Sequence, residues 1–207
     1  MKKICYMMIP ALVLAASMVY LLLAGEQDAA AVRQGVVRFH VVAASDSAED
    51  QQLKLRVRDG LFAMIKELFA DCTDQAAALK TAEENREELE SAAREILQQN
   101  GCDTPITLEI GQRYFPTKDY GSLSFPAGSY QAVSIRIGEA RGQNFWCVLY
   151  PALCIAPAVA EDTAADEMTA VIGEESTHFL QKSTEKEKIK FALVEWFEHF
   201  MQKYLKS

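Results

Sequence analysis

Six polar residues within twenty positions form the densest group of chemically capable side chains in the sequence. They are His40, Asp46, Asp50, Lys54, Arg58 and Asp59. Asp50, Lys54 and Arg58 are spaced four apart, which places them on one stripe of a helix. Such a stripe is typical of a solvated charged face, and physics alone favours that interpretation. The alternative is a partner-binding surface at the end of a strand, where α/β sites often lie.

His40 and the cysteines are the candidates for catalysis. A single histidine without an evident partner is a weak indication of a general base. Four cysteines follow the N-terminal segment: Cys72, Cys102, Cys147 and Cys154. Cys147 has no neighbouring histidine that would activate a thiolate. The chain contains no P-loop, GxGxxG, GxSxG or CxxC motif. We therefore expect that the protein is not an enzyme and has no metal site and no cofactor. The alternative is an extracytoplasmic hydrolase of cell-wall or peptide substrates that uses either His40 and Cys147 or a pair of acidic residues.

The cysteine spacing limits which disulfides can form. Cys72 and Cys102 flank a helix predicted over residues 75–99, and an unbroken helix would hold them roughly 40 Å apart. Cys147 and Cys154 flank a proline-containing bend and could form a bridge. Two buried free thiols are the alternative. Four cysteines outside the cytoplasm are compatible with either outcome.

The N-terminus indicates export. Lys2 and Lys3 precede residues 4–24, a run of 21 residues without a charge. This length fits either a signal peptide or a membrane anchor. Residues 29–31 offer an A-x-A cleavage pattern, and the lysines favour an orientation that leaves the remainder outside the cytoplasm. We assign residues 1–31 to a signal peptide or anchor, with membrane contact only through residues 4–24 if it stays uncleaved.

Residues 32–157 are predicted to form an α+β core. Residues 36–44 are rich in β-branched and aromatic side chains and predict a buried strand. A helix should follow, with either Asp46 and Glu49 or Ser47 and Asp50 at its N-terminus. Residues 106–110 predict a half-exposed strand, residues 114–127 an ordered loop, and residues 130–150 a hairpin. We expect a roughly four-stranded antiparallel or mixed sheet with helices packed on one face.

The C-terminal part of the chain contains two different patterns. Residues 158–184 are acidic and weakly patterned, which predicts a linker with a short helix at its centre. Residues 185–207 predict an amphipathic helix that docks on the core; a membrane surface or a partner groove is the alternative. The formal charge of −8 disfavours a nucleic-acid binder.

Three stretches resemble the stage II sporulation protein R family of endospore-forming Firmicutes. The first runs from Arg38 to Ser47 and continues through Asp50–Gln51, Leu53–Leu55 and Val57–Asp59; the second combines Tyr120–Gly121 with Phe125–Tyr130; the third runs from Asn144 to Cys154. They occur in the same order and span most of the exported chain. Ala44 and Phe145 depart mildly from the family pattern.

The resemblance implies a signalling protein and not an enzyme. Such proteins are secreted from the forespore into the space between the forespore and mother-cell membranes. There they activate a membrane-embedded aspartyl protease of the mother cell, which processes pro-sigma-E. Within this interpretation, the six polar residues that begin with His40 are the expected partner-binding surface.

Overall fold

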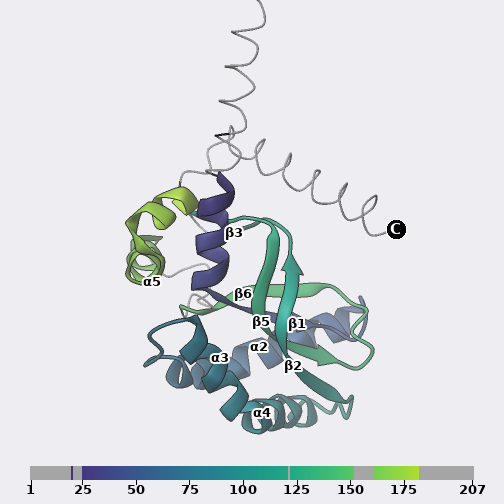
Figure 1. Ribbon diagram of the computed structural model, residues 1–207. Helices are drawn as coiled ribbons and strands as arrows, with labels where there is room; N and C mark the ends of the chain where they lie inside the picture. Colours follow the sequence, from purple (N-terminus) through teal and green to yellow (C-terminus); the bar gives the residue numbers. More distant parts are fainter. Residues whose placement is uncertain (1–19, 21–24, 121, 152–160, 182–207) are drawn as a thin grey trace, which may run out of the picture.

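A four-stranded mixed sheet organises the chain in the computed structural model, which describes residues 20, 25–120, 122–151 and 161–181 (Figure 1). Its order is β2 (Ile106–Phe115), β5 (Gly128–Ile137), β1 (Val37–Val42) and β6 (Asn144–Tyr150). Strand β1 runs parallel to β5 and antiparallel to β6, and β2 runs antiparallel to β5. The predicted α+β class and mixed sheet are confirmed.

The predicted hairpin over residues 130–150 is wrong. Strands β5 and β6 do not pair, because β1 lies between them. The turn that joins them crosses the end of β1, where Arg141 N–H donates to Ala44 O at 3.2 Å and Gly142 N–H to Ala43 O at 3.0 Å. A turn signal shows only that two strands are close in sequence. Which strands become neighbours in the sheet depends on how much apolar surface each strand has to bury. Strand β1 is buried along nearly its whole length and therefore takes the central position.

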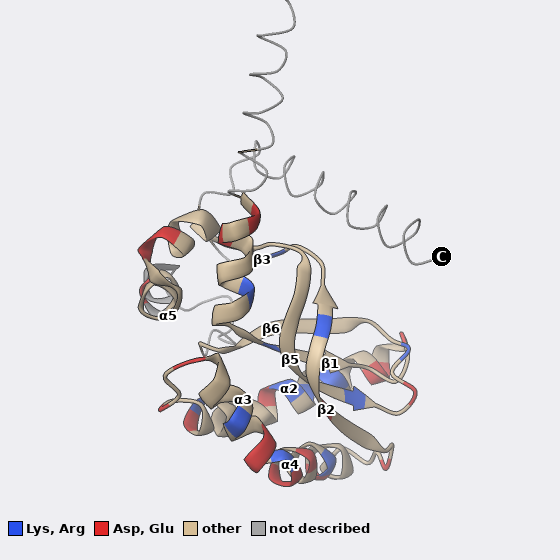
Figure 2. Ribbon diagram, in the orientation of Figure 1, with Lys and Arg blue, Asp and Glu red and all other residues tan. Residues whose placement is uncertain are grey.

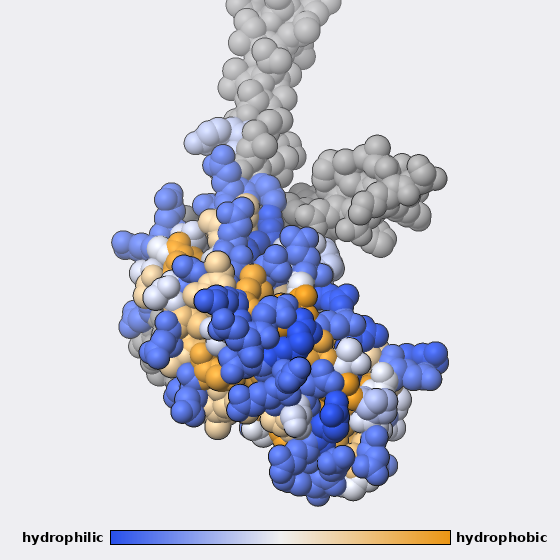
Figure 3. All heavy atoms as spheres, turned by 60° about the horizontal axis from the view of Figure 1, so that its bottom comes forward, coloured by the Kyte–Doolittle hydropathy of each residue, from blue (hydrophilic) through white to orange (hydrophobic). Residues whose placement is uncertain are grey.

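Three helices cover one face of the sheet: α2 (Ala48–Leu68), α3 (Gln75–Glu84) and α4 (Arg86–Gln99). Helix α2 begins at Ser47, whose side chain accepts a hydrogen bond from Asp50 N–H at 3.1 Å, so the structure selects one of the two predicted caps. The single helix predicted over residues 75–99 is instead broken at Asn85. The break lets both halves direct their small and apolar side chains at the same core. The solvent side of this layer is mostly hydrophilic (Figure 3).

Part of the opposite face has its own cover. Helical residues 25–35, the short strands β3 (Lys118–Tyr120) and β4 (Leu123–Phe125), and helix α5 (Glu161–Gln181) contribute to a second apolar cluster (Figure 1). The loop predicted over residues 114–127 therefore contains an additional antiparallel strand pair.

Helix α5 replaces most of the linker that we expected over residues 158–184. Its side chains of Met168 and Leu180 are buried in the second cluster. The helix is interrupted at Gly173, where φ is 82°. Because this interruption changes the direction of the following turns, no continuous 3.6-residue stripe marks the helix in the sequence.

Apart from Tyr20, the N-terminal apolar run at residues 4–24 lies outside the described residues, as do Cys154 and the amphipathic segment at residues 185–207. Within the described part, no helix has the length and apolar character needed to cross a membrane.

Candidate interaction site

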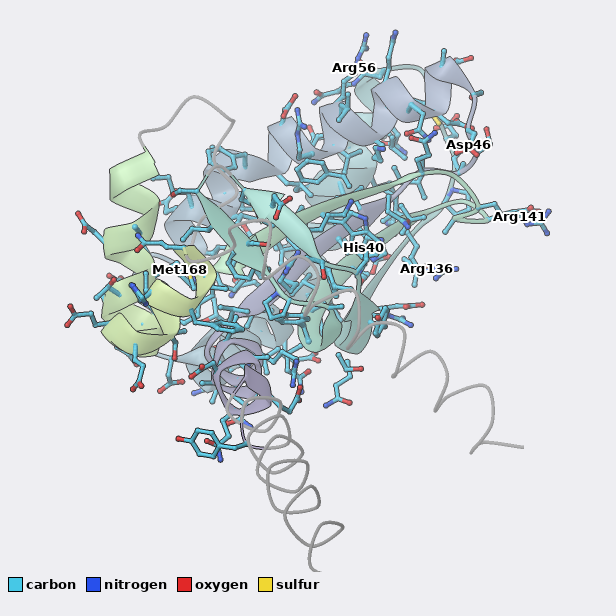
Figure 4. The ribbon with its side chains drawn as sticks, turned by 90° about the horizontal axis from the view of Figure 1, so that it is seen from above. His40, Asp46, Arg56, Arg136, Arg141 and Met168 are labelled. Carbon is cyan, nitrogen blue, oxygen red and sulfur yellow. The ribbon has the colours of Figure 1, made fainter. Side chains whose placement is uncertain are left out.

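The structure divides the six predicted site residues between two sides of the sheet. Side chains alternate along β1, so Val37, Phe39 and Val41 face the helices, while Arg38 and His40 face the other way. The other five predicted residues lie at or on α2, which packs on the first face. Figure 4 shows His40 over the middle of the sheet and Asp46 beyond its end.

Asp46 and Lys54 hold the turn between β5 and β6 against the start of α2, and Asp50 fixes the segment that leads into the helix. The Asp46 carboxylate accepts a hydrogen bond from Gln143 N–H at 2.7 Å, and the Asp50 carboxylate accepts one from the Ser45 hydroxyl. Lys54 Nζ donates to Gln143 O at 3.1 Å, and the residue is only 6% exposed. Burial lowers the pKa of Lys54, and Arg58 lowers it further, whereas Asp46 raises it. These three side chains therefore have a structural task.

Arg58 and Asp59 form a charged pair on α2, in which Asp59 is exposed and Arg58 is half-buried. Arg58 Nε donates to Asp59 Oδ1 at 2.6 Å, and its guanidinium lies 4.8 Å from the centre of the Phe145 ring. The Asp59 side chain is 65% exposed. A charged pair of this kind contributes little to stability, so the two residues are free to serve recognition.

His40 forms a flat aromatic stack with Trp146 on the second face of the sheet. Their ring centres are 4.0 Å apart and the planes differ by 7°. Burial lowers the pKa of His40 to about 4, a hydrogen bond with Asn144 raises it, and Arg113, Arg136 and Arg38 lower it further. His40 is therefore neutral at neutral pH.

Arg38 is a feature that sequence reasoning missed. It is fully buried, and its guanidinium lies 4.6–5.5 Å from the centres of four aromatic rings: Phe115, Tyr120, Phe125 and Tyr130. It donates from Nε to Cys147 O at 3.0 Å and from Nη2 to the Tyr120 hydroxyl at 2.8 Å. An arginine inside a strand predicted to be buried is the signal that could have found it.

Cys147 lies on the opposite face of the sheet from His40. It pairs in register with Phe39, whereas His40 pairs with Trp146. Cys147 is a buried free thiol in the core beneath the helices. Cys154, with which it could form a bridge, lies outside the described residues. The Cys147 side chain is occupied in packing, because β6 alternates and directs it inward. This arrangement separates the thiol and the imidazole that the hydrolase alternative requires.

Cys72 and Cys102 are also free thiols. Among the described residues, no three His, Cys, Asp or Glu side chains come together in a group that could hold a metal ion.

Comparison with known proteins identifies two similarities. Residues 33–160 match the family model described as "Stage II sporulation protein R (spore_II_R)". The stage II sporulation protein R of Bacillus subtilis (strain 168) is 32% identical over 187 residues, which cover 83% of this chain and 84% of that protein. No solved structure matches.

Proposed function

Because this chain belongs to the stage II sporulation protein R family, we propose that it is a secreted signal of sporulation that activates a membrane-embedded aspartyl protease. The protease belongs to the mother cell and processes pro-sigma-E. The signal acts in the space between the forespore and mother-cell membranes. The family match over residues 33–160 carries this proposal, since it covers the sheet, α2 to α4 and the region of the predicted site.

Two observations support a binding role over a catalytic one. The thiol of Cys147 and the imidazole of His40 lie on different faces of the sheet. A nucleophile and its base must lie within hydrogen-bonding distance. Arg58 and Asp59, by contrast, offer accessible charges on a helix that Asp46 and Lys54 hold firmly in place.

The test is co-expression with the aspartyl protease and pro-sigma-E in a host that does not sporulate. We expect cleavage of the precursor when the full chain is exported, and none when a chain lacking residues 1–24 stays in the cytoplasm. This shortened chain begins at Gly25 because residues 25–35 pack on the domain. Cleavage scored by immunoblot in both cases would contradict an extracytoplasmic signal.

The site within this proposal is tested by Arg58→Ala with Asp59→Ala. We expect precursor cleavage to fall severalfold and the melting temperature to fall only modestly, because Asp59 is exposed and Arg58 loses its contact with the Phe145 ring. Lys80→Ala on α3 is the matched control, since its side chain is 75% exposed on another helix. Unchanged cleavage with the double variant would exclude these two residues from the contact.

A further inference from the structure

Among the described residues, the second sheet face is only partly buried around His40, where Arg113 and Asn144 are exposed. Strand register places His40 beside Ser134 of β5 and Trp146 of β6. Arg136, Glu109 and Arg113 extend the same face across β5 and β2. We call this surface, made by His40, Glu109, Arg113, Arg136, Asn144 and Trp146, the open face. Figure 4 shows His40 and Arg136 there.

The open face carries positive charge on an acidic protein. The side chains of Arg113 and Arg136 are 42% and 39% exposed, and both face the same carboxylate of Glu109. Arg136 Nε lies 3.8 Å from Glu109 Oε1, and Arg113 forms an ion pair with the second oxygen. The buried guanidinium of Arg38, two residues before His40 on β1, adds a third positive charge beside this surface. One glutamate therefore balances three arginines, although the whole chain has a formal charge of −8.

The elements around the sheet carry charges of both signs. Figure 2 shows basic residues on the strands and both acidic and basic residues on the helices α2 to α4, whereas α5 carries acidic residues and no Lys or Arg. His40 experiences the positive field directly, since Arg113, Arg136 and Arg38 all disfavour its protonation. Two exposed arginines that share a single carboxylate favour an acidic ligand over a basic one.

Unpaired polar atoms lie at the centre of this charge. Ser134 is 1% exposed, and within the described part of the chain its hydroxyl oxygen has no hydrogen-bond partner; the same holds for Nε2 of His40. Ser134 lies opposite both His40 and Glu109 in the register. A buried polar group without a partner is unfavourable, so the structure beneath the open face is not optimised for stability alone.

The chemistry of the face selects among acidic ligands. Lipid surfaces are typically bound by clusters of about four to eight basic side chains, whereas the open face has two exposed arginines that share a glutamate. The stacked rings of His40 and Trp146 instead offer a rigid aromatic surface beside those arginines. Aromatic residues combined with arginine are typical of the centres of protein–protein contacts.

We propose that the open face docks an acidic segment of a protein partner, with a carboxylate at Arg113 and Arg136 and apolar atoms on the His40–Trp146 stack. The proposal rests on the function above, so that the partner is the extracytoplasmic part of the protease. This surface differs from the Arg58–Asp59 surface, because α2 and the open face are on opposite sides of the sheet. The signal therefore has two surfaces with which to contact its receptor.

The test combines charge reversal with cross-linking in the full chain, co-expressed with the protease and pro-sigma-E. We expect Arg113→Glu with Arg136→Glu to reduce precursor cleavage at least tenfold, and Arg113→Lys with Arg136→Lys to retain most of it. Arg94→Glu on α4 is the matched control, because its side chain is 52% exposed on the far side of the sheet. Circular dichroism melts of all variants check that folding is unchanged.

A photo-activated benzoylphenylalanine at Thr107 then identifies the occupant. Thr107 is exposed and lies beside Arg136 in the register. We expect it to cross-link to the protease, with the product lost on charge reversal at Arg136, whereas the same probe at Lys80 gives none.

The outcomes separate this proposal from the proposed function. Wild-type protein that never promotes cleavage would overturn the proposed function. Cleavage by wild type that is unchanged in the charge-reversed variant would overturn only the docking face. Cross-links from Thr107 to residues 182–207 or to a second copy would assign the face to the chain itself. Arginine-dependent binding to phosphatidylglycerol vesicles would assign it to a membrane, and either result contradicts an acidic protein partner.

Discussion

At the scale of single residues, neighbouring positions on β1 show how environment sets charge. The buried guanidinium of Arg38 is surrounded by four aromatic rings and donates to two acceptors in place of water. His40, two residues later, loses its charge because it is partly buried and experiences three arginines. Two residues apart on β1, the structure therefore accommodates the guanidinium of Arg38 and disfavours the protonated imidazole of His40.

The depressed pKa of His40 predicts a pH-dependent stability. Between pH 6.5 and about 4 the unfolded chain binds a proton at His40 that the folded chain does not. Stability is therefore complete above pH 6.5 and decreases as the pH falls through this range. After allowance for partial exposure, we expect a loss of about 1 kcal/mol between pH 7.5 and 5.

Urea unfolding of wild type and His40→Phe at both pH values measures this loss. The phenylalanine retains an aromatic ring against Trp146 and cannot titrate, so the variant should lose that part of the pH dependence. An equal pH dependence in both proteins would show that other groups cause it.

At the scale of elements, residues 25–35 act as part of the folded domain. Val32 is fully buried in the second cluster. The Gln75 side chain donates to Arg33 O at 3.0 Å and to Val36 O at 2.6 Å, while Arg33 Nη1 donates to Ala127 O at 3.4 Å. The A-x-A pattern at residues 29–31 therefore lies within a helix that the domain uses.

Removal of this helix should destabilise the domain. We expect a chain that begins at Val36 to lose several kcal/mol of unfolding free energy relative to one that begins at Gly25, because Val32 and the Arg33 contacts are lost. Thermal melts of the two chains measure the difference. Mass spectrometry of the exported protein should find residue 25 onward retained. A mature N-terminus at Val32 with an unchanged melting temperature would contradict this role.

At the scale of the whole molecule, the six residues predicted from sequence serve different purposes. Lys54 joins α2 to the turn before β6, whereas Asp59 is exposed and makes no comparable connection. We expect Lys54→Met to cost about 1–2 kcal/mol of stability, because the Gln143 carbonyl loses its donor. Asp59→Asn should leave stability unchanged.

Melts and precursor cleavage measured on both variants distinguish support from recognition. Signalling by Lys54→Met should fall only as far as its folded population falls. A larger loss with a fully folded protein would place Lys54 itself in the contact.

The sequence by itself determined the local structure of this protein. A run of β-branched and aromatic residues predicted the strand after residue 36, and the polar residues that follow it predicted the start of α2, with two candidate caps. These features depend on residues within one or two turns of each other, so their spacing is sufficient to identify them.

The tertiary structure alone decided what those elements bring together. It inserted β1 between β5 and β6, divided His40 from Asp46 and Lys54, and enclosed Arg38 with aromatic rings more than 75 positions away. The order of the strands depends on the apolar surface that all strands of the sheet bury together. That order decides which helices or strands cover each face of β1. The spacing of residues within one segment does not reveal which strands become neighbours. The open face could therefore be identified only from the tertiary structure.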